Sequence, residues 1–174
     1  MPALELFVRP PLLFIPPDGN LVLSPPVLDL NRVLIRELSC TLRVPPIPGA
    51  YHAIFDTGAP LTIFPYDLWH HRFGWQAGRD FDELSVAGVG ATLQGQVLGR
   101  RYTCRLARLR VPVELAGRDL KGDRLRFDSL VCQLADANGP PFILLGLWGG
   151  ALTGRRLVIE PLSNSDDLNA RLEF

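Results

Sequence analysis

A single carboxylate lies within an apolar stretch of the chain, HAIFDTGAPLTIFP at residues 52–65. Asp56 stands in this stretch and is followed directly by Thr57 and Gly58. Burying a carboxylate among apolar residues is costly unless another group pairs with it. An Asp-Thr-Gly sequence can form an ordinary turn, but turns of that kind usually lie among polar residues. The apolar flanks of Asp56 therefore favour a carboxylate that is held in place for chemistry.

A second segment of interest is SVAGVGATLQ at residues 85–94. It predicts a β-hairpin whose tip is formed by Gly88, Val89 and Gly90. Glycine at a hairpin tip permits positive φ angles and lets the backbone come close to a bound molecule. A plain hairpin turn has the same sequence pattern, so this segment alone does not distinguish a binding flap from a turn.

A third segment, FILLGLWGGALTGRRLVIE at residues 142–160, contains Leu144, Leu145 and Gly146 in succession. Taken alone, two apolar residues and a glycine indicate a buried strand that ends at the glycine. The three segments occur together, however, in an order and at separations that resemble the retropepsin-like family of single-lobe aspartic proteases. The resemblance covers roughly residues 39–160.

The resemblance implies a role for each of these residues. Asp56 would be the catalytic carboxylate, with Thr57, Gly58 and Ala59 supporting the loop that carries it. The tip at 88–90 would belong to a flap that closes over bound peptide, and residues 144–146 would pass behind the catalytic loop. The site would use no cofactor and no metal ion. One departure is Leu147, because many members carry Arg or Asp directly after the glycine.

Hydrolysis of this kind requires two carboxylates on one water molecule, one ionised to take a proton and one protonated to polarise the carbonyl group. Two neighbouring carboxylates cannot both ionise cheaply, so their proton release belongs to the pair. The chain contains no second Asp-Thr-Gly or Asp-Ser-Gly, since Asp128-Ser129 is followed by Leu130. We therefore expect a homodimer in which a two-fold axis supplies the second Asp56, acting on a peptide or protein substrate.

The dimer interface is expected at the terminal strands, as in that family. The candidates are residues 4–8 and the segment after Arg156, and the proline-rich residues 10–30 could wrap around the partner. Two other hypotheses remain open. The same fold could be a non-catalytic dimerisation or peptide-binding module, or residues 1–38 could block the cleft of a precursor.

Other arrangements of reactive side chains are less informative. His70 and His71 are neighbours on a predicted helix, so their side chains diverge and do not form a chelating pair. No G-x-S-x-G sequence supports a serine nucleophile. The arginines at 100–110 alternate with apolar residues, which indicates a solvated sheet face rather than a nucleic-acid patch.

The elements that must position these residues are predicted to be strands. The sequence has 16 Gly and 16 Pro, which punctuate short β-favouring runs all along the chain. We expect an all-β fold, a retropepsin-like acid protease barrel with one lobe per chain and one or two short helices. Residues 65–74 and 147–153 are the helix candidates. In the run 102–115, the apolar positions change phase between Leu106 and Ala107, which predicts a bulge or bend in one long strand.

Length and composition fit one compact domain. The chain has 174 residues, a net charge of zero and 47% hydrophobic residues, which suits a real core and gives no sign of a nucleic-acid partner. We expect a proline-rich arm at 1–38, the main domain at 39–160 and an extension at 161–174. Three cysteines without a C-x-x-C motif suggest buried thiols in a reducing compartment. The expected location is the cytoplasm, with no signal peptide and no membrane span.

Overall fold

The structure is a computed structural model that describes residues 1–9, 12–15, 20–23, 37–56, 58–85, 92–97, 100–119, 121–146, 152–161 and 168–174. Within these ranges the protein is all-β apart from one short helical segment, η1 (Asp67–Arg72). The strands before the middle of the chain are β1 (Ala3–Glu5), β2 (Phe7–Arg9), β3 (Leu12–Ile15), β4 (Asn20–Leu23), β5 (Glu37–Val44), β6 (Ile47–Phe55), β7 (Thr62–Phe64) and β8 (Phe81–Glu83). The later strands are β9 (Thr92–Val97), β10 (Arg100–Leu109), β11 (Val113–Ala116), β12 (Arg124–Phe127), β13 (Val131–Ala135), β14 (Ile143–Leu145), β15 (Arg156–Pro161) and β16 (Leu168–Glu173).

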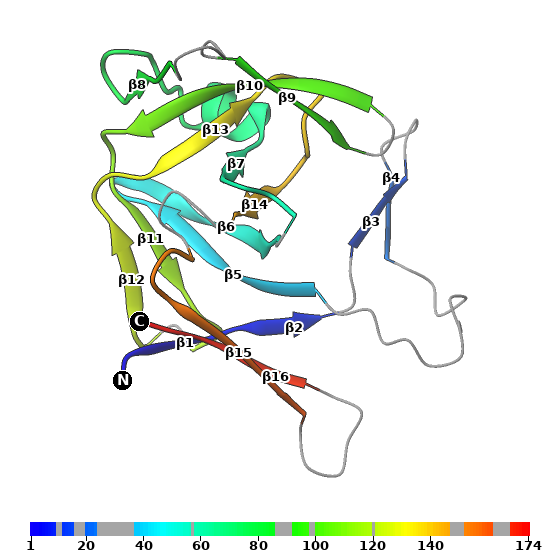
Figure 1. The fold of residues 1–174 in the computed structure, drawn as a ribbon, viewed down its shortest axis with the longest axis vertical. Coiled ribbons are helices and arrows are strands. Elements are labelled where there is room, and N and C mark those ends of the chain that lie inside the picture. Colours follow the sequence, from blue (N-terminus) through cyan, green and yellow to red (C-terminus); the bar gives the residue numbers. More distant parts are fainter. Residues whose placement is uncertain are drawn as a thin grey trace.

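Most strands belong to one large mixed sheet with the order β12-β11-β5-β6-β14-β7-β13-β10-β8 (Figure 1). Strand β2 adds to β5, β9 adds to β10, and β3 pairs with β4 in a separate hairpin. At the centre of the large sheet, β14 runs parallel to β6 and antiparallel to β7. All three residues of β7 are buried, as expected for a strand covered on both faces. Asp56 emerges from this buried centre.

The first and last strands form a second sheet with the order β1-β16-β15, which we call the terminal sheet. Leu4 pairs with Leu172, and the amide of Leu6 donates to the Ala170 carbonyl at 2.8 Å. The chain then enters the large sheet, because β2 pairs with β5. The predicted strand at 4–8 is therefore divided between two sheets. Both ends of the chain lie beside each other in this region (Figure 1).

The loop after β11 holds β1 from its other side. The Ala3 amide donates to the Asp123 carboxylate at 3.0 Å, and the Arg118 amide donates to the Glu5 carbonyl at 2.7 Å. A Cβ atom at Gly117 would lie 2.4 Å from the Glu5 carbonyl oxygen, so the close approach requires glycine. Strand β1 is thus flanked on both sides by its own chain.

The helix predicted at 65–74 is confirmed by η1. Its last turn is wide, since the Phe73 amide donates to the Leu68 carbonyl at 2.8 Å. Trp69 anchors it, because the buried indole N–H donates to the Ala135 carbonyl at 2.8 Å. In the described part of the chain, no helix has both the length and the apolar character needed to cross a membrane. The second helix candidate, 147–153, falls mainly outside the described residues.

The predicted long strand at 102–115 is instead two strands, β10 and β11, which end and begin on either side of Pro112. The predicted phase change is confirmed, because Leu106 and Ala107 are both buried. An extra residue in β10, which would make a bulge, is not the cause of this phase change. Pairing with β13 continues without interruption from Cys104 to Arg108, so the burial reflects cover on both faces of β10 rather than a bulge.

The three cysteines are free and buried, as predicted. Burial raises the pKa of each thiol above its ordinary value, that of Cys104 to about 12. Cys40, Cys104 and Cys132 therefore behave as small apolar residues near neutral pH.

Candidate active site

The loop that carries Asp56 connects two neighbours of β14. Strand β6 places Ala53 and Phe55 in the core, and Asp56 follows directly after its last residue. The Asp56 amide donates to the Leu145 carbonyl at 3.1 Å, and the Asp56 carbonyl accepts from the Ala59 amide at 3.2 Å. The backbone N–H and C=O groups of Asp56 are therefore both hydrogen-bonded, and these bonds fix the position of its Cα atom.

The carboxylate of Asp56 is also held locally. Its Oδ1 accepts a hydrogen bond from the Gly58 amide at 2.8 Å. A Cβ atom at Gly58 would lie 3.2 Å from the same oxygen, a tight contact that glycine avoids. Asp56 is only partly buried, and in the described part of the chain its side chain bonds to no other carboxylate. The site thus presents one oriented carboxylate per chain.

Strand β14 passes behind this loop, and we call β6, β14, β7 and the Asp56 loop the loop crossing. Leu145 pairs with Phe55 on β6, and Leu144 pairs with Ile63 on β7. Gly146 then meets the loop, because a Cβ atom there would lie 2.4 Å from the Leu61 carbonyl carbon. Residues 144–146 are therefore brought against the loop from the far end of the sequence.

A small apolar cluster joins the loop to neighbouring strands of the sheet. Its buried members are Ala59, Ile63, Tyr102, Cys104 and Ala135, with Leu144 packed against them. Ala59 of the loop therefore stands on an apolar base, and only one of these side chains has a polar end.

Tyr102 is a site neighbour that the sequence did not single out. Its ring crosses the paired Gly95 of β9, where a Cβ atom would lie 2.4 Å from the ring carbon Cζ. Burial raises the pKa of Tyr102, and the charges of Cys104 and then Asp56 add to the effect. The phenol therefore lies within electrostatic reach of Asp56. An aromatic residue opposite a strand glycine can mark such a position. Finding that pair in the sequence requires the register of the hairpin, which the sequence does not give.

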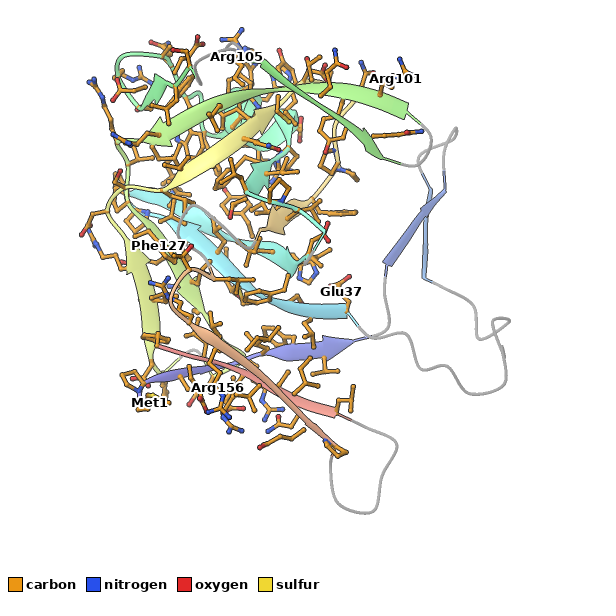
Figure 2. All side chains as sticks on the ribbon, in the orientation of Figure 1. Met1, Glu37, Arg101, Arg105, Phe127 and Arg156 are labelled. Carbon is orange, nitrogen blue, oxygen red and sulfur yellow. The ribbon has the colours of Figure 1, made fainter. Side chains whose placement is uncertain are left out.

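A second carboxylate, that of Glu37, is buried and has a side-chain partner. Glu37, whose side chain is 6% exposed, bonds to Nε2 of His52 at 2.6 Å. It lies at the start of β5 (Figure 2). Glu37 therefore bonds to a side chain of its own chain, whereas Asp56 accepts only a backbone amide among the described residues.

Some of the predicted site residues lie outside the described part of the chain. Thr57 and the flap tip at Gly88, Val89 and Gly90 fall outside the described residues. His70 and His71 pack around the Tyr66 ring. Within the described ranges, no group of three or more His, Cys, Asp or Glu side chains is arranged to hold a metal ion.

Comparison with known proteins finds similarity to solved structures alone. No protein-family model matches the chain, and no curated protein matches it. Among solved structures, the crystal structure of EDGP is similar, with a TM-score of 0.50 and 11% sequence identity. The match covers 98% of this chain but 45% of EDGP, so the chain spans less than half the length of that neighbour. At this identity the likeness concerns the fold alone.

Proposed function

We propose that the chain is one half of an aspartic endopeptidase of the retropepsin-like kind, active as a homodimer. The observation that carries the proposal is the hold on Asp56. Its amide is tied to Leu145 of β14, and its carboxylate accepts the Gly58 amide. An ordinary surface turn has no need of a buried strand behind it, whereas a reacting carboxylate must be positioned within tenths of an ångström.

The chemistry needs both copies of Asp56. The ionised Asp56 takes a proton from water while the water oxygen bonds to the carbonyl carbon of the peptide. The protonated Asp56 of the second copy gives its proton to the carbonyl oxygen. When the C–N bond breaks, the first carboxyl group protonates the leaving nitrogen and the second takes a proton back from the intermediate, so both return to their starting states.

The surroundings of the loop support a substrate with apolar side chains. The cluster beside Asp56, which includes the buried Ala59 and Ile63 and the partly buried Leu144, contains no charged side chain. We expect cleavage between apolar residues of an unfolded or extended segment. The unpaired buried cysteines support a reducing location such as the cytoplasm.

The first test compares cleavage of denatured casein by the wild type and Asp56→Asn between about pH 4 and 7. We expect the substitution to lower activity by about 10²-fold or more. The fold should survive, because the oxygen of Asn can still accept the Gly58 amide. Asp128→Asn is the matched control. Asp128 is also followed by a hydroxyl residue, Ser129, but among the described residues its side chain bonds to the exposed Arg126 alone. Cleavage that survives Asp56→Asn would exclude the mechanism.

A second test asks whether both carboxylates are needed. Wild type and Asp56→Asn are mixed in varied proportions at constant total concentration and allowed to exchange subunits. If each active site uses one Asp56 from each copy, activity follows the square of the wild-type fraction. A linear dependence would mean that each chain works alone. The same data address the non-catalytic alternative, which predicts no cleavage by any mixture.

A further inference from the structure

The face of the sheet that carries Asp56 also carries a histidine. Ile54, Leu144 and Ile63 lie side by side on β6, β14 and β7, and the last two belong to the apolar cluster beside the Asp56 loop. Alternate residues of a strand share one face, so His52 and Asp56 lie on either side of Ile54 on that face. His52 therefore faces the same side of the sheet as the candidate catalytic group.

Glu37 holds the imidazole of His52 from the neighbouring strand. Strand β5 pairs Thr41 with His52, and Glu37 at the start of β5 shares the face of Thr41 because the two are four residues apart (Figure 2). Oε1 of Glu37 lies 2.6 Å from Nε2 of His52, and the two side chains are 6% and 32% exposed. A buried carboxylate requires a partner of this kind. The bond engages one nitrogen of the ring and fixes the direction of the other.

The other ring nitrogen of His52 is the open side of this pair. Among the described residues, no group bonds to Nδ1 of His52. In mild acid an imidazole carries a proton on both nitrogens. Nε2–H then donates to Glu37, and Nδ1–H is left to donate to a second acceptor. The buried carboxylate thus orients a donor that the fold itself does not use.

The charged residues around His52 favour an anionic partner. Arg43 lies two residues beyond the β5 partner of His52 on the same face, so the two are diagonal neighbours. Glu114 of β11 lies opposite Arg43 and is already bonded by another arginine. Strand β2 places the backbone of Arg9 opposite Glu37, and β14 adds no charged residue. The protonated pair is therefore neutral, with an arginine beside it.

The separation of His52 from Asp56 matches the repeat of an extended peptide. Antiparallel strands rise about 3.4 Å per residue, so the four steps from Asp56 to His52 along β6 span about 14 Å. An extended peptide covers the same distance in about four residues. A side chain that meets His52 therefore belongs to a residue within about four positions of the bond held at Asp56.

We infer that His52, oriented by Glu37, binds an acidic side chain of the substrate, Asp or Glu, within about four residues of the cleaved bond. The inference rests on the proposed function, because it gives that peptidase a second point of recognition beside the apolar cluster. The selection operates in mild acid, where the imidazolium donates from Nδ1 to the substrate carboxylate. It fades above about pH 7, because the imidazole then loses its proton and its charge.

Matched synthetic peptides test this selection. Overlapping casein segments are prepared without phosphate, once with their native glutamates and once with glutamine in place of each glutamate. The ratio of kcat/KM for the two forms of each segment is measured from about pH 5 to about pH 8. We expect the best-cleaved segments to show about a fivefold preference for the glutamate form at the acid end and nearly none at the alkaline end.

Two substitutions of His52 separate its charge from its bulk. His52→Gln should remove the preference at every pH, whereas His52→Lys should keep it and extend it to about pH 8, because an ammonium group stays protonated there. Cleavage of the glutamine peptides reports whether each variant still folds. His70→Gln is the matched control, since His70 is exposed on η1 and stacks on Tyr66. Equal cleavage of both peptide forms by the wild type, or a preference that survives His52→Gln, would overturn the inference.

Binding without cleavage separates this inference from the proposed function. Asp56→Asn, with and without His52→Gln, is titrated with the same peptides carrying a fluorescein label, and the dissociation constants are measured by anisotropy. A preference for the glutamate form that depends on His52, together with a wild type that cuts nothing, would keep the inference and remove the peptidase. Cleavage without that preference would do the reverse. A protein that neither binds nor cuts any of the peptides would overturn both.

Discussion

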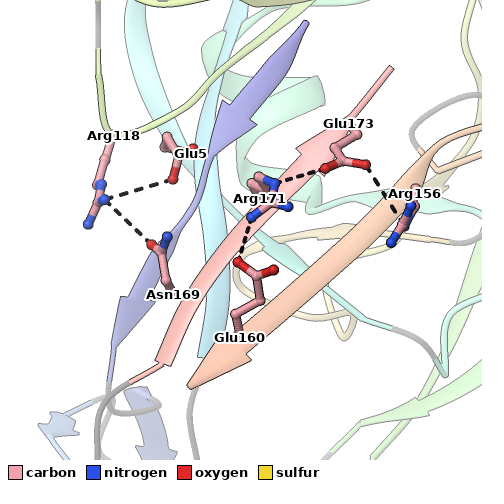
Figure 3. A network of polar contacts seen from close by, with 7 residues as sticks. All are labelled: Glu5, Arg118, Arg156, Glu160, Asn169, Arg171 and Glu173. Atoms are coloured by element: carbon pink, nitrogen blue, oxygen red, sulfur yellow. Dashed lines mark hydrogen bonds and ion pairs between the residues drawn. The ribbon is translucent and has the colours of Figure 1, made fainter. Parts of the chain in front are cut away.

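The loop crossing and the terminal sheet are held together in different ways. At the loop crossing, backbone hydrogen bonds and apolar packing fix Asp56, and Gly146 lies so close to Leu61 that no side chain fits between them. In the terminal sheet, charged side chains such as Arg171 and Glu160 connect β16 to β15 (Figure 3). The first region is complete within one chain. In the second, β15 pairs with β16 on one side and with no other described strand.

The largest expected effect comes from breaking the loop crossing. Gly146→Ala should lower the free energy of unfolding by about 3 kcal/mol or more, because the added methyl group meets backbone that cannot move aside. Gly78→Ala is the control. Gly78 has a φ of +78° and nothing within 4 Å, so its substitution should cost only about 1 kcal/mol. Urea denaturation measures both, and equal losses would show that the close approach at Gly146 is not a constraint.

An intermediate effect is expected beside the loop crossing, where Asp136 accepts hydrogen bonds from the amide and hydroxyl of Thr103 and from the Asn138 amide. Partial burial alone would raise the pKa of Asp136, but these bonds outweigh it and hold the pKa below its ordinary value of 3.8. The ionised form therefore stabilises the fold above that value, and the contribution disappears as the pH falls through the lowered pKa.

Asp136→Asn should consequently cost about 1 kcal/mol at pH 6. The difference from the wild type should shrink below the ordinary carboxyl pKa, as seen in urea denaturation at a series of pH values. A difference that stays constant into acid would mean that the charge of Asp136 does not matter.

The smallest effect is expected in the terminal sheet. Arg171→Met removes a bond to Glu160, whose side chain is 54% exposed, so that this bond is screened by salt. It also removes a bond to Glu173, a mostly buried side chain that keeps Arg156 at 3.9 Å. The loss of stability should be less than that of Asp136→Asn and should decrease in high salt at a fixed protein concentration. A loss as large as that of Gly146→Ala would erase the contrast between the two regions.

Local patterns predict one part of this structure well. Apolar residues around Asp56 indicate strands on both sides of it, and Pro65 with Gly74 indicates the helix between them. The change of phase at Leu106 and Ala107 is visible in the alternation. These features depend on neighbours in the sequence, whose spacing is fixed by the geometry of a strand or a helix.

Long-range pairing is the part that local patterns leave open. The run 4–8 indicates a strand, but its composition does not say that the chain changes sheets at Leu6, nor that β16 of the same chain is its partner. The position of Tyr102 is left open for the same reason, because it depends on which strands pair with β10. The alternation of apolar and polar residues predicts which face of the sheet a side chain occupies. It does not predict which strand will pair with the one that carries it.

The pairing of β1 with β16 also sets an order of events during synthesis. Residues 3–5 are made long before residues 171–173, their partners in the terminal sheet. Leu4 and Leu6, buried in the finished protein, must therefore wait until the intervening residues have been made before that sheet can close. Closing so long a loop is slow, and until it happens the nascent chain exposes an apolar strand that chaperones could bind.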